Sequence, residues 1–191
     1  MKKKILTICL VVWLSSLAYC QTDMMFYGIP IKGSYTLFTN QLKDKGFTFK
    51  KELKPTLKIW KGTFLNKDVD IVIVMTPTSK EVWKTSVYFK EQTNWVDLKS
   101  EFESVCSKIT DKYGPVSSRY SNFNSPFEEG DGYELTAVKS DKSNFFFMWN
   151  LEAGSISVSI SKSCCVQISY ESKSGVELKQ KEDAKIADEQ L

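Results

Sequence analysis

The sequence follows one pattern twice: a short amphipathic helix that ends in lysine and glycine, and then a long run of strand-forming residues. The first helix ends at Lys45-Gly46 and the second at Lys112-Tyr113-Gly114. A repeated unit constrains a fold strongly, because both copies must bury the same kind of face. We therefore expect an α+β fold with antiparallel sheet, in which two helix-plus-sheet repeats, about 26–92 and 93–172, pack their helices on one sheet face.

Capping residues mark the boundaries of both helices. Ser34 and Asn94 each precede an apolar stripe and can accept hydrogen bonds from the first amide groups of a helix. Gly46 and Gly114 suit the left-handed conformation that ends many helices, and Pro115 stops the second helix. The side chains expected to be buried are Leu37, Phe38 and Leu42 in the first helix, and Leu98, Phe102, Val105, Cys106 and Ile109 in the second.

Runs of β-branched and aromatic residues, in part alternating with polar ones, predict the strands. Along 144–151, Phe145, Phe147 and Trp149 should point to one face and Phe146 and Met148 to the other. The polar stretch 116–131 is interpreted as a long loop with room for one edge strand. The strands are expected at 47–51, 57–64, 69–75, 82–89, 133–138, 144–151, 155–161 and 164–170.

The first 20 residues have the features of an export signal. Three lysines precede an apolar core, and Ala18-Tyr19-Cys20 provides a cleavage site. The core is shorter than the roughly 20 apolar residues that a transmembrane helix needs. Lipidation at Cys20 is the alternative, disfavoured by the bulky Tyr19 before it. We expect a periplasmic or secreted protein, attached to the outer membrane only if Cys20 is lipidated.

The rest of the chain is expected to form one domain and a tail. Residues 21–172 contain both repeats, and we expect a monomer. Residues 173–191 are rich in Lys, Glu, Asp and Gln. Such a segment has too little apolar surface to offset the entropy of ordering it. We therefore predict a charged flexible tail that is frayed or loosely helical.

Charge and composition exclude several functions. The chain has 26 basic and 23 acidic residues, and the signal accounts for three of the lysines, so the remaining charges balance. A neutral chain has no field that would attract nucleic acid. The absence of histidine removes the usual general base and the usual zinc ligand. We expect no enzyme activity, no catalytic residues, no metal and no cofactor.

Three cysteines follow the signal: Cys106, Cys164 and Cys165. Neighbouring strand residues point to opposite faces, so Cys164 should face the helix that carries Cys106. If a disulfide forms, Cys106–Cys164 is the expected pair. The alternative is that the buried cysteines stay free and pack as small apolar groups.

Two further clusters have both a functional and a structural interpretation. Glu128, Glu129 and Asp131 could offer oxygen ligands to calcium, but they lack the spacing of an EF-hand loop and favour a solvated turn. Aromatic side chains on an open sheet face would mark a partner surface, unless other elements cover them. The candidate surface consists of Trp60, Trp83, Phe146, Met148 and Trp149.

The order of elements and the helix stop from Lys112 to Pro115 resemble the beta-lactamase-inhibitor-protein-like fold, which also occurs in small outer-membrane assembly lipoproteins. The opening from Phe26 to Ser34 is similar to that of exported Gram-negative proteins without an assigned function. The resemblance covers about 26–172 and implies binding through a sheet face, with no residue roles transferred. We expect a non-enzymatic binding module, an inhibitor or assembly factor of the cell envelope. A carrier of a small apolar ligand under a curved sheet is the alternative.

Overall fold

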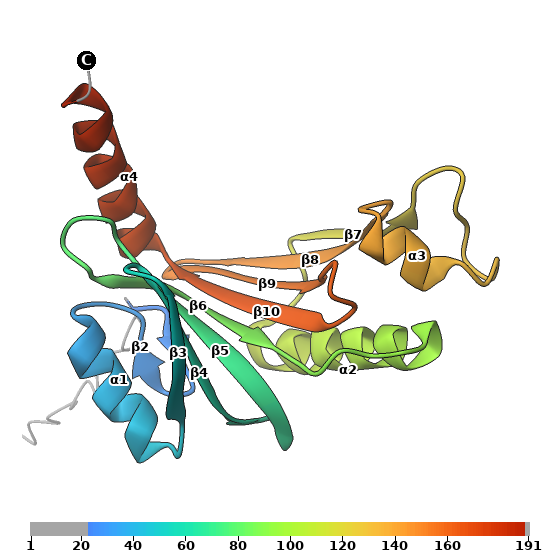
Figure 1. Ribbon diagram of the computed structural model, residues 1–191, viewed down its shortest axis with the longest axis horizontal. Coiled ribbons are helices and arrows are strands. Elements are labelled where there is room, and N and C mark those ends of the chain that lie inside the picture. The colour runs from blue at the N-terminus through green and yellow to red at the C-terminus, as the bar shows by residue number, and fades with distance from the viewer. Residues whose placement is uncertain (1–22, 190–191) are drawn as a thin grey trace, which may run out of the picture.

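The computed structural model describes residues 23–189, which form an α+β fold with four helices, one large sheet and one small sheet (Figure 1). The expected signal segment, including Cys20, lies outside the described residues. The helices are α1 Tyr35–Asp44, α2 Trp95–Tyr113, α3 Glu134–Lys139 and α4 Lys173–Asp188. The small sheet pairs β1 Met25–Phe26 with β2 Ile29–Pro30.

The large sheet has eight antiparallel strands in the order β3-β4-β5-β6-β10-β9-β8-β7. Strands β3 to β6 fill one half and β7 to β10 the other, and β6 meets β10 at the centre, where Val87 lies opposite Ile168. Edge strand β7 lies inside the stretch expected to be a loop with one strand. The strands are β3 Thr48–Lys54, β4 Leu57–Phe64, β5 Lys67–Met75, β6 Val82–Tyr88, β7 Ser118–Phe123, β8 Ser143–Leu151, β9 Gly154–Ile160 and β10 Val166–Ser172.

Both expected helices begin at the predicted caps. The Ser34 hydroxyl accepts from the amide of Leu37, and the Asn94 side chain accepts from the amide of Asp97. Helix α1 ends in a Schellman motif, in which the amides of Gly46 and Phe47 donate to the carbonyls of Lys43 and Leu42. Leu37 departs from the prediction, because it is 64% exposed rather than buried with Phe38.

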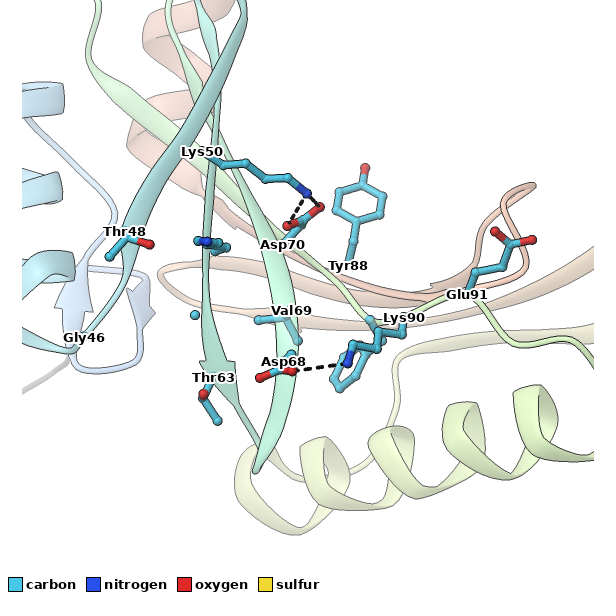
Figure 2. Close-up of a pocket in the computed structure, with 13 residues that line it drawn as sticks. Gly46, Thr48, Lys50, Thr63, Asp68, Val69, Asp70, Tyr88, Lys90 and Glu91 are labelled. Carbon is cyan, nitrogen blue, oxygen red and sulfur yellow. Dashed lines mark hydrogen bonds and ion pairs between the residues drawn. The ribbon is translucent and has the colours of Figure 1, made fainter.

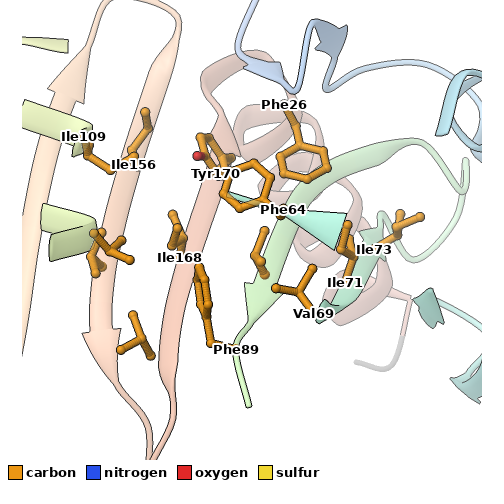
Figure 3. Packing of buried hydrophobic residues seen from close by; sticks show 14 of the residues in the cluster. Phe26, Phe64, Val69, Ile71, Ile73, Phe89, Ile109, Ile156, Ile168 and Tyr170 are labelled. Carbon is orange, nitrogen blue, oxygen red and sulfur yellow. The ribbon is translucent and has the colours of Figure 1, made fainter. Parts of the chain in front are cut away.

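Helices α1 and α2 lie on the same side of the sheet, which we call the helix-covered face (Figure 1). The strand register aligns one row of apolar side chains straight across this face, and all but Phe147 are buried. Ile109 of α2 packs near Ile156 of β9 (Figure 3). The row runs from β4 to β8 through Trp60, Ile71, Val87, Ile168, Val158 and Phe147.

The small sheet and the end of α1 complete the core beside β4. Phe26 stacks on Phe64 with ring centroids 5.6 Å apart (Figure 3). Phe47 is 1% exposed and its ring covers Gly62 of β4. A Cβ atom added at Gly62 would lie 2.1 Å from Phe47 Cδ1, so only glycine fits there.

One predicted strand is wrong: residues 133–138 were expected to pair, but Glu134–Lys139 forms α3. Asp131 accepts from the amide of Tyr133, and the Glu134 carboxylate accepts from the amide of Gly130. These hydrogen bonds order the turn that precedes α3. The short apolar run fits helical spacing as well as alternation, so its pattern could not distinguish the two structures.

The charged segment, expected to be a frayed or loosely helical tail, forms the regular helix α4 through Asp188. Ser172 caps it, and no residue of α4 is buried. The helix is attached to the sheet at a few points. Gly175 lies against Trp83, with a virtual Cβ only 2.6 Å from Trp83 Cβ. The Glu182 carboxylate accepts from the backbone amides of Thr78 and Ser79, at 2.6 and 3.1 Å.

Candidate functional site

The sheet has a second side, opposite α1 and α2, which we call the open face. Helix α4 rises from one end of this side (Figure 1). On each strand, the residue next to the buried row points to the open face. The register aligns these residues in a second row, and every side chain in it is half-buried or exposed. This row runs from β4 to β7 through Lys61, Asp70, Tyr88, Gln167, Ser159, Phe146 and Tyr120. At roughly 4.8 Å per strand it spans about 29 Å.

The centre of the open face is made of serine hydroxyls. Ser86 and Ser169 meet across the β6–β10 seam with their Oγ atoms 2.8 Å apart, and Gln167 donates to Ser169 at 3.0 Å. Ser157 continues the same row on β9. Ser86 and Ser169 are only 2% and 3% exposed, so this polar seam is itself buried, and the Lys84–Glu171 ion pair lies beside it across the same two strands.

The β7–β8 end of the open face is apolar and aromatic. Phe146 and Met148 are half-buried, and Tyr120 is 53% exposed. Tyr120 lies opposite Phe146, and Met148 opposite Ser118, in the β7–β8 ladder. Large side chains with a solvent-exposed surface on a rigid sheet provide contact area at low entropic cost, which favours partner binding.

The β3–β6 end is charged and contains a pocket of about 610 Å³ (Figure 2). Lys50 pairs with Asp70 at 2.7 Å, and Lys90 pairs with Asp68 at 3.2 Å. Most of its charged side chains are exposed, so the pocket is open to solvent and polar. Such a lining does not provide the enclosed apolar surface that a carrier of an apolar ligand needs.

The expected partner surface is split between the two faces. Trp60 and Trp149 were wrong choices: they are 2% and 1% exposed on the helix-covered face. Their ring N–H groups donate to Tyr35 Oη and to the Gly114 carbonyl. Trp83 is half-buried, and α4 packs against it. Phe146 and Met148 lie on the open face; the alternation along β8 predicted that they share a face opposite Trp149, but not which face is open.

All three cysteines in the described part of the chain are free and buried. This is the alternative to a Cys106–Cys164 pair; Cys164 lies in the turn before β10, where its Sγ points to the carbonyl of Leu135. Burial raises the pKa of Cys106 to about 12 and also raises the pKa values of Cys164 and Cys165. These thiols are therefore poor nucleophiles.

The acidic loop forms internal contacts. Asp131 accepts from the amides of Glu128 and Tyr133, and Glu129 pairs with Lys99 of α2. Within residues 23–189, no group of three or more His, Cys, Asp or Glu side chains could hold a metal ion. In the same residues, none of the helices has both the length and the apolar character needed to cross a bilayer.

Sequence reasoning missed Arg119 and Tyr120 on β7. Arg119 is the only arginine in a chain with 25 lysines, and its side chain is exposed. Composition alone could have drawn attention to it, because arginine and tyrosine are enriched at interfaces whereas lysine is depleted. Comparisons with protein-family models, with curated proteins and with solved structures find no match to this chain.

Proposed function

We propose that this chain is an exported, non-enzymatic binding module that holds a protein partner on its open face. The observation that carries the proposal is the contrast between two adjacent rows across one sheet. The row containing Ile71 is buried under the helices except at Phe147, whereas every side chain of the row containing Tyr88 is at least partly exposed over about 29 Å. The aromatic end would contribute most of the binding energy.

The proposal includes a fold of two matching halves of the beta-lactamase-inhibitor-protein-like type. The strand order supports it, because α1 precedes one half of the sheet and α2 the other, and the last strands of the halves, β6 and β10, pair at the centre. A binding surface that crosses this centre would use both halves. We propose that the protein is a monomer in the envelope or outside the cell.

The test is affinity capture from a cell-envelope extract of the native organism with a matched pair of variants. Phe146→Ser with Met148→Ser changes the open face, and Leu37→Ser changes a more exposed apolar position on α1. The open-face variant should lose partners that the wild type and Leu37→Ser retain, while its thermal unfolding changes little. Identical capture by all three proteins would refute the proposal, and a large loss of stability would assign both residues to the core.

A further inference from the structure

The outer edge of β7 has unpaired backbone groups. Within residues 23–189, β7 pairs only with β8. The amide of Asn124 donates to the carbonyl of Lys142, and this pair continues the β7–β8 register. Because hydrogen-bonded and non-hydrogen-bonded pairs alternate in an antiparallel ladder, the backbone groups of Arg119 and Ser121 point away from β8. They are available to another strand.

The two edges of the sheet differ in their protection. Edge strand β3 contains Lys50, Lys51 and Lys54 and has two register shifts against β4. Lysines and bulges are the devices by which proteins block strand addition. Strand β7 has an unbroken register over six residues and contains no lysine, proline or acidic residue. The edge that carries Arg119 is therefore the unprotected one.

Arg119 also lacks an internal partner. No ion pair or hydrogen bond joins its guanidinium to another residue of the described chain, although 11 ion pairs involve lysines. A guanidinium holds a carboxylate through two parallel hydrogen bonds, which a lysine cannot do. Arg119 and Tyr120 point to opposite faces of β7, so a strand placed beside β7 would meet both.

We propose that an extended peptide segment of the partner adds to β7 as a ninth strand, with one of its carboxylates bound by Arg119. The main-chain hydrogen bonds would supply affinity and the side chains at Arg119 and Tyr120 would supply selectivity. This inference rests on the proposed function in that the partner is a protein. The proposed strand addition gives the partner a second contact, at the β7 edge beside the open face.

The probe is a random dodecapeptide library displayed on phage and selected on the purified protein. Recovered peptides are then synthesised and titrated against variants. Ser121→Pro removes one outward amide donor and leaves the β8 ladder intact, whereas Ser121→Ala keeps the amide. We expect acidic peptides whose affinity falls by about tenfold or more with Ser121→Pro and by less than about twofold with Ser121→Ala.

Two further measurements guard against misfolding of the proline variant. Arg119→Gln should weaken the same peptides, and Arg119→Lys should not restore full affinity. In the wild type, bound peptide should slow hydrogen exchange at the amides of Arg119 and Ser121. Peptides that bind Ser121→Pro as tightly as the wild type, or a failure to recover any peptide that depends on Ser121, would overturn strand addition. Loss of peptide binding only with Phe146→Ser would overturn it too, yet leave the proposed function standing.

Discussion

Gly62→Ala tests the packing of β4 against Phe47. Carbon atoms in contact normally lie about 3.5–4.0 Å apart. The added Cβ would lie 2.1, 2.6 and 2.8 Å from three atoms of the Phe47 ring, so the whole edge of the ring must move. Phe47 is fully enclosed and directly follows the end of α1, which leaves it little room. The substitution should therefore strain both β4 and the entry to β3.

Gly62→Ala should destabilise the protein, whereas a Gly→Ala substitution in a strand usually stabilises it. In an unhindered strand, Gly→Ala should stabilise by about 0.5–1 kcal/mol through backbone entropy. Overpacking costs about 1–3 kcal/mol, so Gly62→Ala should lower the free energy of unfolding by about 1–2 kcal/mol. For a domain of this size that shift is roughly 2–8 °C in Tm. Urea unfolding followed by tryptophan fluorescence measures the change in the free energy of unfolding, and thermal unfolding measures the change in Tm.

A double-mutant cycle identifies the cause. Phe47→Leu makes room for the new methyl group, so Gly62→Ala should cost less in the Phe47→Leu background than in the wild type, with a coupling energy of about 0.5 kcal/mol or more. If Gly62→Ala is neutral or stabilising, or if the two substitutions are additive, the argument from the Phe47 ring is wrong.

Three other predictions follow from contacts described above. Tyr35→Phe leaves the enclosed Trp60 ring N–H without its acceptor, now 3.0 Å away, and should cost about 1–3 kcal/mol in urea unfolding; an unchanged midpoint would contradict this. Burial alone would raise the pKa of Glu182, but hydrogen bonds from Ser79 and Thr78 lower this pKa below its ordinary value of 4.5. The attachment of α4 should therefore persist at neutral pH and weaken as the pH falls below 4.5. Hydrogen exchange of α4 measures this, and Glu182→Gln should show no such acid dependence. Iodoacetamide should label Cys106 slowly in the native protein and rapidly in urea, as read by intact mass, because burial raises the pKa of its thiol; equal rates would refute its protection.

Periodicity and capping predicted helices α1 and α2 and most strands well, because these signals are local. Ser34 and Asn94 cap α1 and α2 as expected, and strand β4 begins and ends at the predicted residues. Residues 133–138 were misassigned because a pattern of apolar residues this short fits helical spacing as well as strand alternation. The regular, attached form of helix α4 was not predicted, because its attachment depends on Trp83 and on the turn at Thr78, about 100 residues earlier in the chain.

The candidate site was predictable only in part. Alternation along β8 separated Phe146 and Met148 from Trp149, since that inference needs only the strand itself. Which face the helices cover depends on strand order, so Trp60 and Trp149 could not be recognised as core residues from their own neighbourhoods. The sequence left free cysteines and a Cys106–Cys164 bridge as alternatives for a similar reason: it does not show that Cys164 has the positive φ of a turn rather than the extended conformation of a strand.

The central seam imposes an order of events on folding. Ser86 and Ser169 touch across it although they are 83 residues apart in the chain. Strands β3 to β6 can pair through short local connections, but the other edge of β6 stays unpaired until β10 pairs with it. Contacts between such distant segments form slowly, because closing the long loop costs conformational entropy before any stabilising strand pairing forms. A newly made chain is therefore most vulnerable to misassembly in the interval before its last strand arrives.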